Sequence, residues 1–357
     1  MYSEQDLIGA VQAGAISPQA AEALRAHVAT LRQAPTVDEE QFRLLTGFND
    51  IFVAIAAALL LAAVGWIGGS VWAPLAGVAV AAAAWSLAEY FTRQRRMALP
   101  SILLLIAFVG GVAGTFGGLI ADNAESLGRW IEGLSENENV RVAAAGVIAA
   151  MVAAITAGAA WLHWRRFMVP ITVAAGAVAV VGVVLSLVVG LVPPARDALL
   201  PLVLLAGVGM FAFAMRWDIS DRERRTRRSD VAFWLHLAAA PMIAHSVFNL
   251  LGVFERTIGT GTALVVIALY IVFALVALAV DRRALLVSSL AYVLFALVSL
   301  FRTAGAVELS AALTGLVIGS ALLLLSAFWH RMRVLVVGWT GSLQQKLPPV
   351  QQPMLPA

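Results

Sequence analysis

Residues 51–71 read IFVAIAAALLLAAVGWIGGSV, a run that contains no charged side chain. A helix needs about 20 apolar residues to cross the hydrocarbon core of a bilayer. Lipid cannot satisfy free backbone N–H and C=O groups, so a helix is the expected form of such a run. The stretch therefore predicts a membrane-spanning helix.

Nine similar runs follow, and together they predict an all-α, polytopic membrane helix bundle. The ten predicted spans cover residues 49–69, 71–91, 99–121, 140–162, 168–191, 197–215, 231–253, 260–280, 284–303 and 307–329. Hydrophobic residues make up 61% of the chain and charged residues 13%, whereas a soluble domain carries about 25% charged residues. A polar leader precedes the first run, so we expect a retained span rather than a cleaved signal.

The basic residues between the spans fall on alternate loops. With the N-terminus inside, 19 of the 24 basic residues lie on inner segments and five on outer segments. Cytoplasmic loops of membrane proteins carry such an excess of Lys and Arg. We therefore predict that both chain ends are cytoplasmic.

Soluble segments flank the predicted bundle. The chain divides into a cytoplasmic helical hairpin, a ten-span bundle and a cytoplasmic tail, at residues 1–46, 47–330 and 331–357. Ser17 followed by Pro18 is a typical helix start within the hairpin. Its apolar stripe suits packing of the hairpin on itself or docking onto a protein partner. The tail is amphipathic at first, and its Pro-rich end, Leu347–Ala357, is predicted to be disordered.

Few polar side chains lie within the predicted spans, and each is a candidate because polar groups are costly in a bilayer. They are Glu89, His163 at the end of the fourth span, His236, His245 and Asn249. His245 and Asn249 are four residues apart and share one helix face, which we expect to face the bundle interior. Pro241 removes a backbone hydrogen bond and predicts a kink beside them. This segment suits a proton relay or a solute contact, or a His bonded to a neighbouring helix. Glu89 suits headgroup contact or pairing with Arg93 one turn on.

The inner loop at residues 216–230 reads RWDISDRERRTRRSD, with six Arg against four acids. One interpretation is a topology signal with internal ion pairs. The other is binding of anionic lipid headgroups by the basic side chains. The Arg residues concerned are Arg222, Arg224, Arg225, Arg227 and Arg228. Nucleic acid is not expected as a partner, because the run is short and most of its charge is cancelled.

Small residues recur every four positions in several spans. Gly110, Gly114 and Gly118 form one such stripe in the third span. Small residues allow helices to approach closely. The stripe therefore predicts close packing within the bundle, or contacts between copies of the chain.

Two classes of function fit this sequence. No Cys, zinc-binding spacing, phosphate loop or nucleophile elbow is present, so we expect neither a metal nor another cofactor, and an enzyme is the less favoured class. The first class is a transporter or channel for a small solute or protons, since ten spans divide into five plus five. The second is a non-catalytic sensor, lipid-binding protein or assembly protein. Membrane lipids are expected partners of either.

Three segments resemble a family of uncharacterised bacterial inner-membrane proteins. They are DLIGAVQAGAISPQAAEALRAHV at residues 6–28, SDVAFWLHLAAAPMIAHSVFNLLG at 229–252 and WHRMRVLVVGWTGSLQQKLPP at 329–349. Members of that family begin with a short soluble helical hairpin and continue as a multi-pass domain of unknown function. The resemblance implies a location in the bacterial inner membrane, and it assigns no functional residue.

Overall fold

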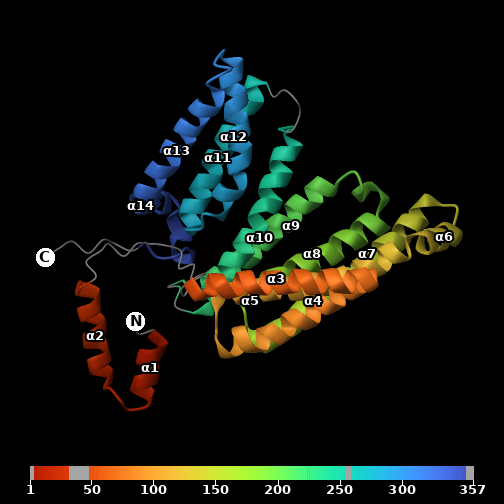
Figure 1. Cartoon of the computed structure of the whole chain (residues 1–357). Coiled ribbons are helices and arrows are strands. Elements are labelled where there is room, and N and C mark those ends of the chain that lie inside the picture. The colour runs from red at the N-terminus through yellow and green to blue at the C-terminus, as the bar shows by residue number, and fades with distance from the viewer. Residues whose placement is uncertain (1–3, 32–47, 223, 225, 254–258, 351–357) are drawn as a thin grey trace. The chain divides into compact units, whose positions relative to one another are not determined.

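The computed structural model describes residues 4–31, 48–222, 224, 226–253 and 259–350 (Figure 1). Within these residues every regular element is a helix. Ten helices are long and apolar enough to cross a membrane. The predicted all-α class and ten-span bundle are therefore confirmed. By its internal contacts the chain forms two compact units, Met1–Phe42 and Arg43–Ala357.

The first unit contains two helices, α1 (Glu4–Gln12) and α2 (Pro18–Leu31). Gly14 has a φ of 70° in the turn after α1, a conformation that glycine adopts without steric cost. The hydroxyl of Ser17 accepts a hydrogen bond from the backbone N–H of Ala20 at 3.1 Å. Ser17 therefore caps the start of α2, as its position before Pro18 predicts.

The second unit holds the ten candidate spans. They are α3 (Phe48–Val71), α4 (Ala73–Ala88) with its π-helical continuation η1 (Glu89–Gln94), α5 (Ala98–Asp122), α7 (Glu138–Phe167), α8 (Ile171–Leu191), α9 (Leu199–Ser220), α10 (Arg227–Leu250), α11 (Thr260–Val280), α12 (Ala284–Thr303) and α13 (Ser310–Ala327). Four short helices lie between and after them: α6 (Ala124–Leu134), η2 (Pro193–Ala195), α14 (Trp329–Trp339) and η3 (Gly341–Lys346). The end of α9 lies beyond the predicted boundary at residue 215, so Asp218 belongs to the helix and not to a loop.

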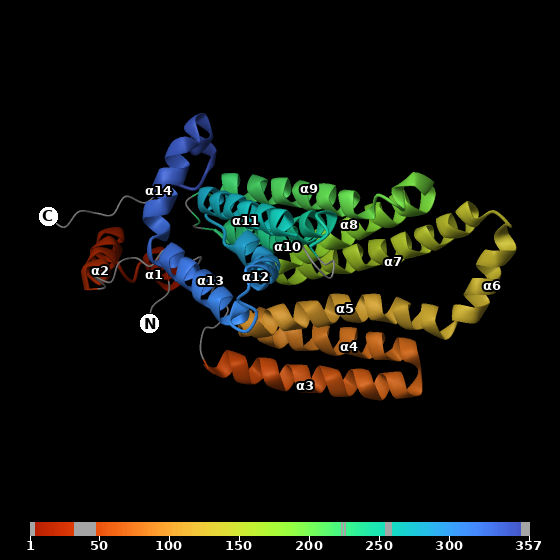
Figure 2. The ribbon, with the colours of Figure 1, turned by 90° about the horizontal axis from the view of Figure 1, so that it is seen from above.

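Neighbours in sequence pack as neighbours in space. Helices α3, α4 and α5 lie side by side (Figures 1 and 2), and α7 packs along α8. Helix α10 contacts α8, α9 and α12, and it is the most buried span. In its most apolar stretch of 18 residues, half of the residues are buried. The buried share of the same stretch is 39% or less in every other span. Helix α10 therefore joins the earlier spans to the later ones.

Glycines bring α4 and α5 into contact along a face that includes only one residue of the predicted stripe, Gly118. A Cβ built at Gly111 would lie 2.8 Å from the carbonyl oxygen of Gly77. At Gly118 it would lie 2.8 Å from the backbone nitrogen of Pro74, whereas at Gly110 and Gly114 no atom lies within 4 Å. The contact face thus runs through Gly111 and Gly118. Periodicity alone does not say which of two neighbouring small-residue faces meets another helix.

The tail packs against the bundle as far as residue 350. Trp329, Arg333, Val336 and Val337 are buried on α14, which packs against α11. Leu347 is also buried, in a cluster with Val337. The disorder of the chain end stays a prediction, and the structure places the apolar side chains of Leu347 and Val350 in a packed cluster. Residues 351–357 lie outside the described part of the chain.

Candidate functional site

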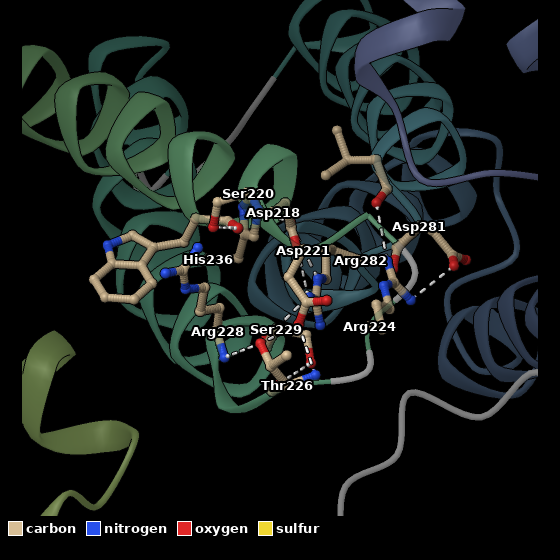
Figure 3. A network of polar contacts seen from close by, with 12 residues as sticks. Asp218, Ser220, Asp221, Arg224, Thr226, Arg228, Ser229, His236, Asp281 and Arg282 are labelled. Carbon is tan, nitrogen blue, oxygen red and sulfur yellow. Dashed lines mark hydrogen bonds and ion pairs between the residues drawn. The ribbon is translucent and has the colours of Figure 1, made fainter.

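The carboxylate of Asp218 is the centre of a buried group of charged side chains (Figure 3). Asp218 lies near the end of α9 and is 2% exposed. One oxygen lies 2.8 Å from Nε2 of His236 on α10. The other accepts a hydrogen bond of 2.6 Å from Nη2 of Arg282. An ionised carboxylate only accepts, so Nε2 of His236 carries the hydrogen of their contact.

Arg282 joins three elements at this point. It lies in the turn between α11 and α12 and is 5% exposed. Besides Asp218, its Nη2 donates to the backbone carbonyl of Ser229 at the start of α10, at 3.0 Å. The guanidinium also lies over the ring of Phe233 at 5.9 Å. A planar guanidinium with several donors suits such simultaneous contacts better than an ammonium group does.

The neighbouring residue Asp281 organises a second set of contacts. It ends α11 in the left-handed conformation, with φ of 61°, which Asp tolerates better than most residues. Its carboxylate accepts the indole N–H of Trp329 at 2.8 Å and the Nη1 of Arg224 at 2.8 Å. Arg333 lies 3.5 Å away. Because Asp281 and Arg282 are adjacent, the two sets of contacts form one cluster, here named the charge cluster.

Burial removes water from the charged groups of the charge cluster. This loss of hydration costs free energy, and it also strengthens the attraction between opposite charges. Arg224 lies outside the spans, and burial lowers the pKa of its guanidinium, as does the nearby charge of Arg282. The negative charges of Asp281 and Asp218 act in the opposite direction and raise that pKa. Arginine stays protonated in proteins, so Arg224 keeps its charge and depends on these carboxylates to offset the lost hydration.

A narrow crevice lies beside His236 and Arg282. It is lined by Phe211, His236, Val276, Ala277, Val280, Arg282, Ala284 and Leu285, and it has no room for a water molecule. The ring of Phe211 meets the imidazole of His236 edge-on, with 4.9 Å between centroids. Nδ1 of His236 is buried and has no hydrogen-bond partner among the described residues. The imidazole therefore has one nitrogen engaged and one unused.

The other predicted candidates of α10 lie apart from the charge cluster. His245 is exposed on the isolated chain, and its Nδ1 lies 2.9 Å from the hydroxyl of Tyr292 on α12. Asn249 is half-buried. Pro241 lies inside α10, which continues past it without interruption. The predicted bend at Pro241 stays a prediction, and only His236 of this segment belongs to the charge cluster.

Glu89 makes ion pairs at the junction of α4 and η1. It pairs with Arg93 at 3.3 Å, as its spacing suggests, and also with Arg166 at the end of α7. The Arg166 contact is bidentate, with distances of 2.6 and 2.9 Å. The carboxylate remains 30% exposed, so water screens the pair and we expect it to contribute little to stability. Glu89 therefore links the end of α4 to the end of α7 and is not part of a buried site.

The Arg-rich loop divides between internal contacts and exposure. Arg224 belongs to the charge cluster, and Nε of Arg222 donates to the backbone carbonyl of Leu347 at 3.0 Å. Arg227 and Arg228 are exposed, while Arg225 lies outside the described residues. The contact with anionic lipid that we predict for this loop therefore rests on Arg227 and Arg228.

Most members of the charge cluster are not among the residues that sequence reasoning singles out. They are Asp218, Asp281, Arg282, Trp329 and Arg333. A signal is present: Asp218 and Asp281 are acids on predicted inner segments, where the topology rule counts only Lys and Arg. No group of three His, Asp or Glu among the residues that the structure describes is placed to hold a metal ion. Asp218 and His236 would supply only two ligands.

The comparisons with known proteins assign no role to the charge cluster. The segments that resemble uncharacterised inner-membrane proteins identify no family, so what stands is a multi-pass helical membrane protein with ten candidate spans. No protein-family model, no curated protein and no solved structure matches the chain.

Proposed function

We propose that the protein is a transporter or channel of the bacterial inner membrane that moves protons, alone or together with a small solute. The Asp218–His236 pair is the proposed proton-carrying group. The observation that carries this proposal is the burial of both side chains, each 2% exposed, at a junction of three spans. The excess of Arg on alternate loops supports the inner-membrane orientation.

The cost of this arrangement favours a functional role over a structural one. Replacing a buried ion pair by well-packed apolar residues is often neutral or stabilising. The chain is 61% hydrophobic, so apolar residues at the positions of the pair would match its general composition. Ionisable side chains retained at the membrane are typical of ion and proton pathways.

The geometry gives His236 a means of linking a proton to movement. Its Nε2–H is bound to Asp218, and its Nδ1 is free to accept a proton. A proton on Nδ1 makes His236 a cation, so His236 and Arg282 then share a single carboxylate. The contact of Arg282 with Asp218 weakens, and Arg282 holds the α11–α12 turn against α9. Protonation would therefore loosen the packing of these spans.

Reconstituted vesicles test the proposal. Purified protein is placed in liposomes that contain a pH-sensitive dye, and a potassium diffusion potential drives proton entry. We expect proton uptake above that of protein-free liposomes, and we expect His236→Gln to abolish it while the protein stays folded. A parallel electrical screen adds pools of amino acids, sugars, organic acids and inorganic ions. No current and no proton uptake in either assay would contradict the proposal.

A second candidate is a non-catalytic membrane protein that senses, binds lipid or assists assembly. The observation in its favour is the dry crevice at His236, which has no room for water, together with the engagement of His245 by Tyr292. The exposed Arg227 and Arg228 supply contacts for anionic headgroups. The α1–α2 hairpin supplies a surface for a protein partner. Pull-down with the full chain and with an Arg227→Gln/Arg228→Gln variant on anionic and neutral vesicles tests the lipid contact.

A further inference from the structure

The segment Leu347–Val350, with the sequence LPPV, is docked in an apolar site made by three helices. Leu347 is 7% exposed and packs in a cluster with Val280 of α11 and Val337 of α14. Phe211 and Met215 of α9 and Val276 of α11 pack against the same cluster, as does Val350. The end of the described chain therefore lies on spans that are more than 60 residues away in sequence.

Two arginines hold the backbone of this segment. Nε of Arg222 donates to the carbonyl of Leu347 at 3.0 Å. Arg333 donates to the carbonyl of Pro348 at 2.6 Å and to that of Pro349 at 3.1 Å. Proline has no N–H, so Pro348 and Pro349 present acceptors only. A site with two guanidinium groups and an apolar floor is complementary to such a segment.

The docking site and the crevice at His236 share their walls. Phe211, Val276 and Val280 line the crevice, and the same three side chains pack against the cluster that holds Leu347. Phe211 also touches the imidazole of His236 edge-on. Phe211 thus contacts both the imidazole of His236 and the cluster that holds Leu347, so the docking site and the crevice adjoin each other.

We infer that Leu347–Val350 is a plug, which closes a passage from the predicted cytoplasmic side to His236 and leaves when the passage opens. The claim that protons use this passage rests on the proposed function. The claim that the segment closes the passage does not. The dryness of the crevice is then a property of the plugged state. Arg222 and Arg333 act as the latch, because both bind the plug through its carbonyls.

A cysteine accessibility experiment tests this inference, and the natural chain contains no Cys. Ala277→Cys places a small thiol in the crevice, at a residue that is 1% exposed. Inside-out vesicles are treated with a membrane-impermeant maleimide. Leu347→Asp, in the full-length chain, makes docking of the plug unfavourable. We expect labelling of the thiol to accelerate by roughly tenfold or more, because burial of a leucine side chain shifts an equilibrium by at least that factor.

Matched variants separate opening of the passage from general loosening. Leu343→Asp is the control, since Leu343 lies in η3 and is 57% exposed; it should leave the labelling rate unchanged. Gln344→Cys, an exposed position, should label fast with either tail. Arg222→Gln provides a second way to release the plug if Leu347→Asp does not fold. In that variant too, we expect labelling of Ala277→Cys to accelerate.

Three outcomes would overturn the inference. The first is labelling of Ala277→Cys at the rate of Gln344→Cys with the native tail in place, which would show that no occlusion exists. The second is a thiol that stays unlabelled in every folded release variant, which would show that no passage lies beneath the segment. The third is acceleration of labelling by Leu343→Asp to the same extent as by Leu347→Asp. None of these labelling measurements depends on proton movement. Accelerated labelling without proton uptake would therefore contradict the proposed function and still support the plug.

Discussion

The indole N–H of Trp329 donates to the carboxylate of Asp281 at 2.8 Å, across 48 residues of chain. Trp329 is 4% exposed, and its ring also lies 4.7 Å from the guanidinium of Arg283. One side chain at the start of α14 therefore binds both the end of α11 and the turn that follows it. This contact fixes the tail to the bundle.

Replacing Trp329 by Phe should destabilise the protein by about 1–3 kcal/mol, because a buried carboxylate loses one donor while most of the ring packing remains. The measurement is denaturant unfolding in detergent micelles. Trp339→Phe is the matched control, since Trp339 lies on the same helix and is 77% exposed. Equal effects of the two substitutions would contradict a specific role for the Asp281 contact.

Asp218→Asn should be strongly destabilising. It leaves Arg282 buried without its full counter-charge, and breaking a buried pair in this way costs about 3–5 kcal/mol. Glu125→Gln, at an exposed position of α6, should change stability little. In a double-mutant cycle, Arg282→Gln added to Asp218→Asn should cost less than the sum of the two single changes. Additive costs would show that the two residues do not interact.

Gly77→Ala should weaken the packing of α4 on α5. A methyl group there meets the backbone of Gly111 and Thr115, and overpacking costs about 1–3 kcal/mol or more. Gly110→Ala adds the same methyl group on a face of α5 where no atom lies within 4 Å. We expect lower folded yield and lower melting temperature for Gly77→Ala alone. Loss of stability in Gly110→Ala as well would indicate that its face meets another copy of the chain.

Single cysteines should report opposite sides of the membrane. Glu136 and Gln344 are both exposed, one on the predicted outer loop and one in the predicted cytoplasmic tail. In intact cells, an impermeant thiol reagent should label Glu136→Cys and spare Gln344→Cys, with the reverse in inside-out vesicles. Labelling of both positions from one side would contradict the predicted orientation of the spans.

The spans are predictable because their signal is local. An apolar run such as residues 260–280 predicts both a helix and its length. The observed helix α11 is Thr260–Val280. The end of α9 is harder to predict, since the charged residues after residue 215 resemble a loop. They continue the helix to Ser220 because Asp218 finds Arg282 and His236. A charged helix end of this kind reads as a loop whenever its partners are unknown.

The charge cluster is not predictable from the sequence because its members meet only through the tertiary fold. Arg282 lies 64 residues beyond Asp218, and a count of loop arginines treats it as a topology signal. His236 is identified from its depth in the span, but its partner is not. His245 contacts the hydroxyl of Tyr292 on α12, and spacing along α10 does not identify that residue. Which helices are neighbours decides these contacts, and periodicity does not contain that information.

One buried carboxylate, that of Asp218, precedes its arginine partner in the order of synthesis. Asp218 is made 64 residues before Arg282, which at about 5–20 residues per second is an interval of roughly 3–13 s. Asp281 then precedes Trp329 by 48 residues. During the first interval the nascent chain holds Asp218 without the arginine that neutralises it, and during the second it holds Asp281 without its indole donor. Biogenesis of this protein should therefore require protection of incomplete chains, and premature termination before Trp329 should mark them for degradation.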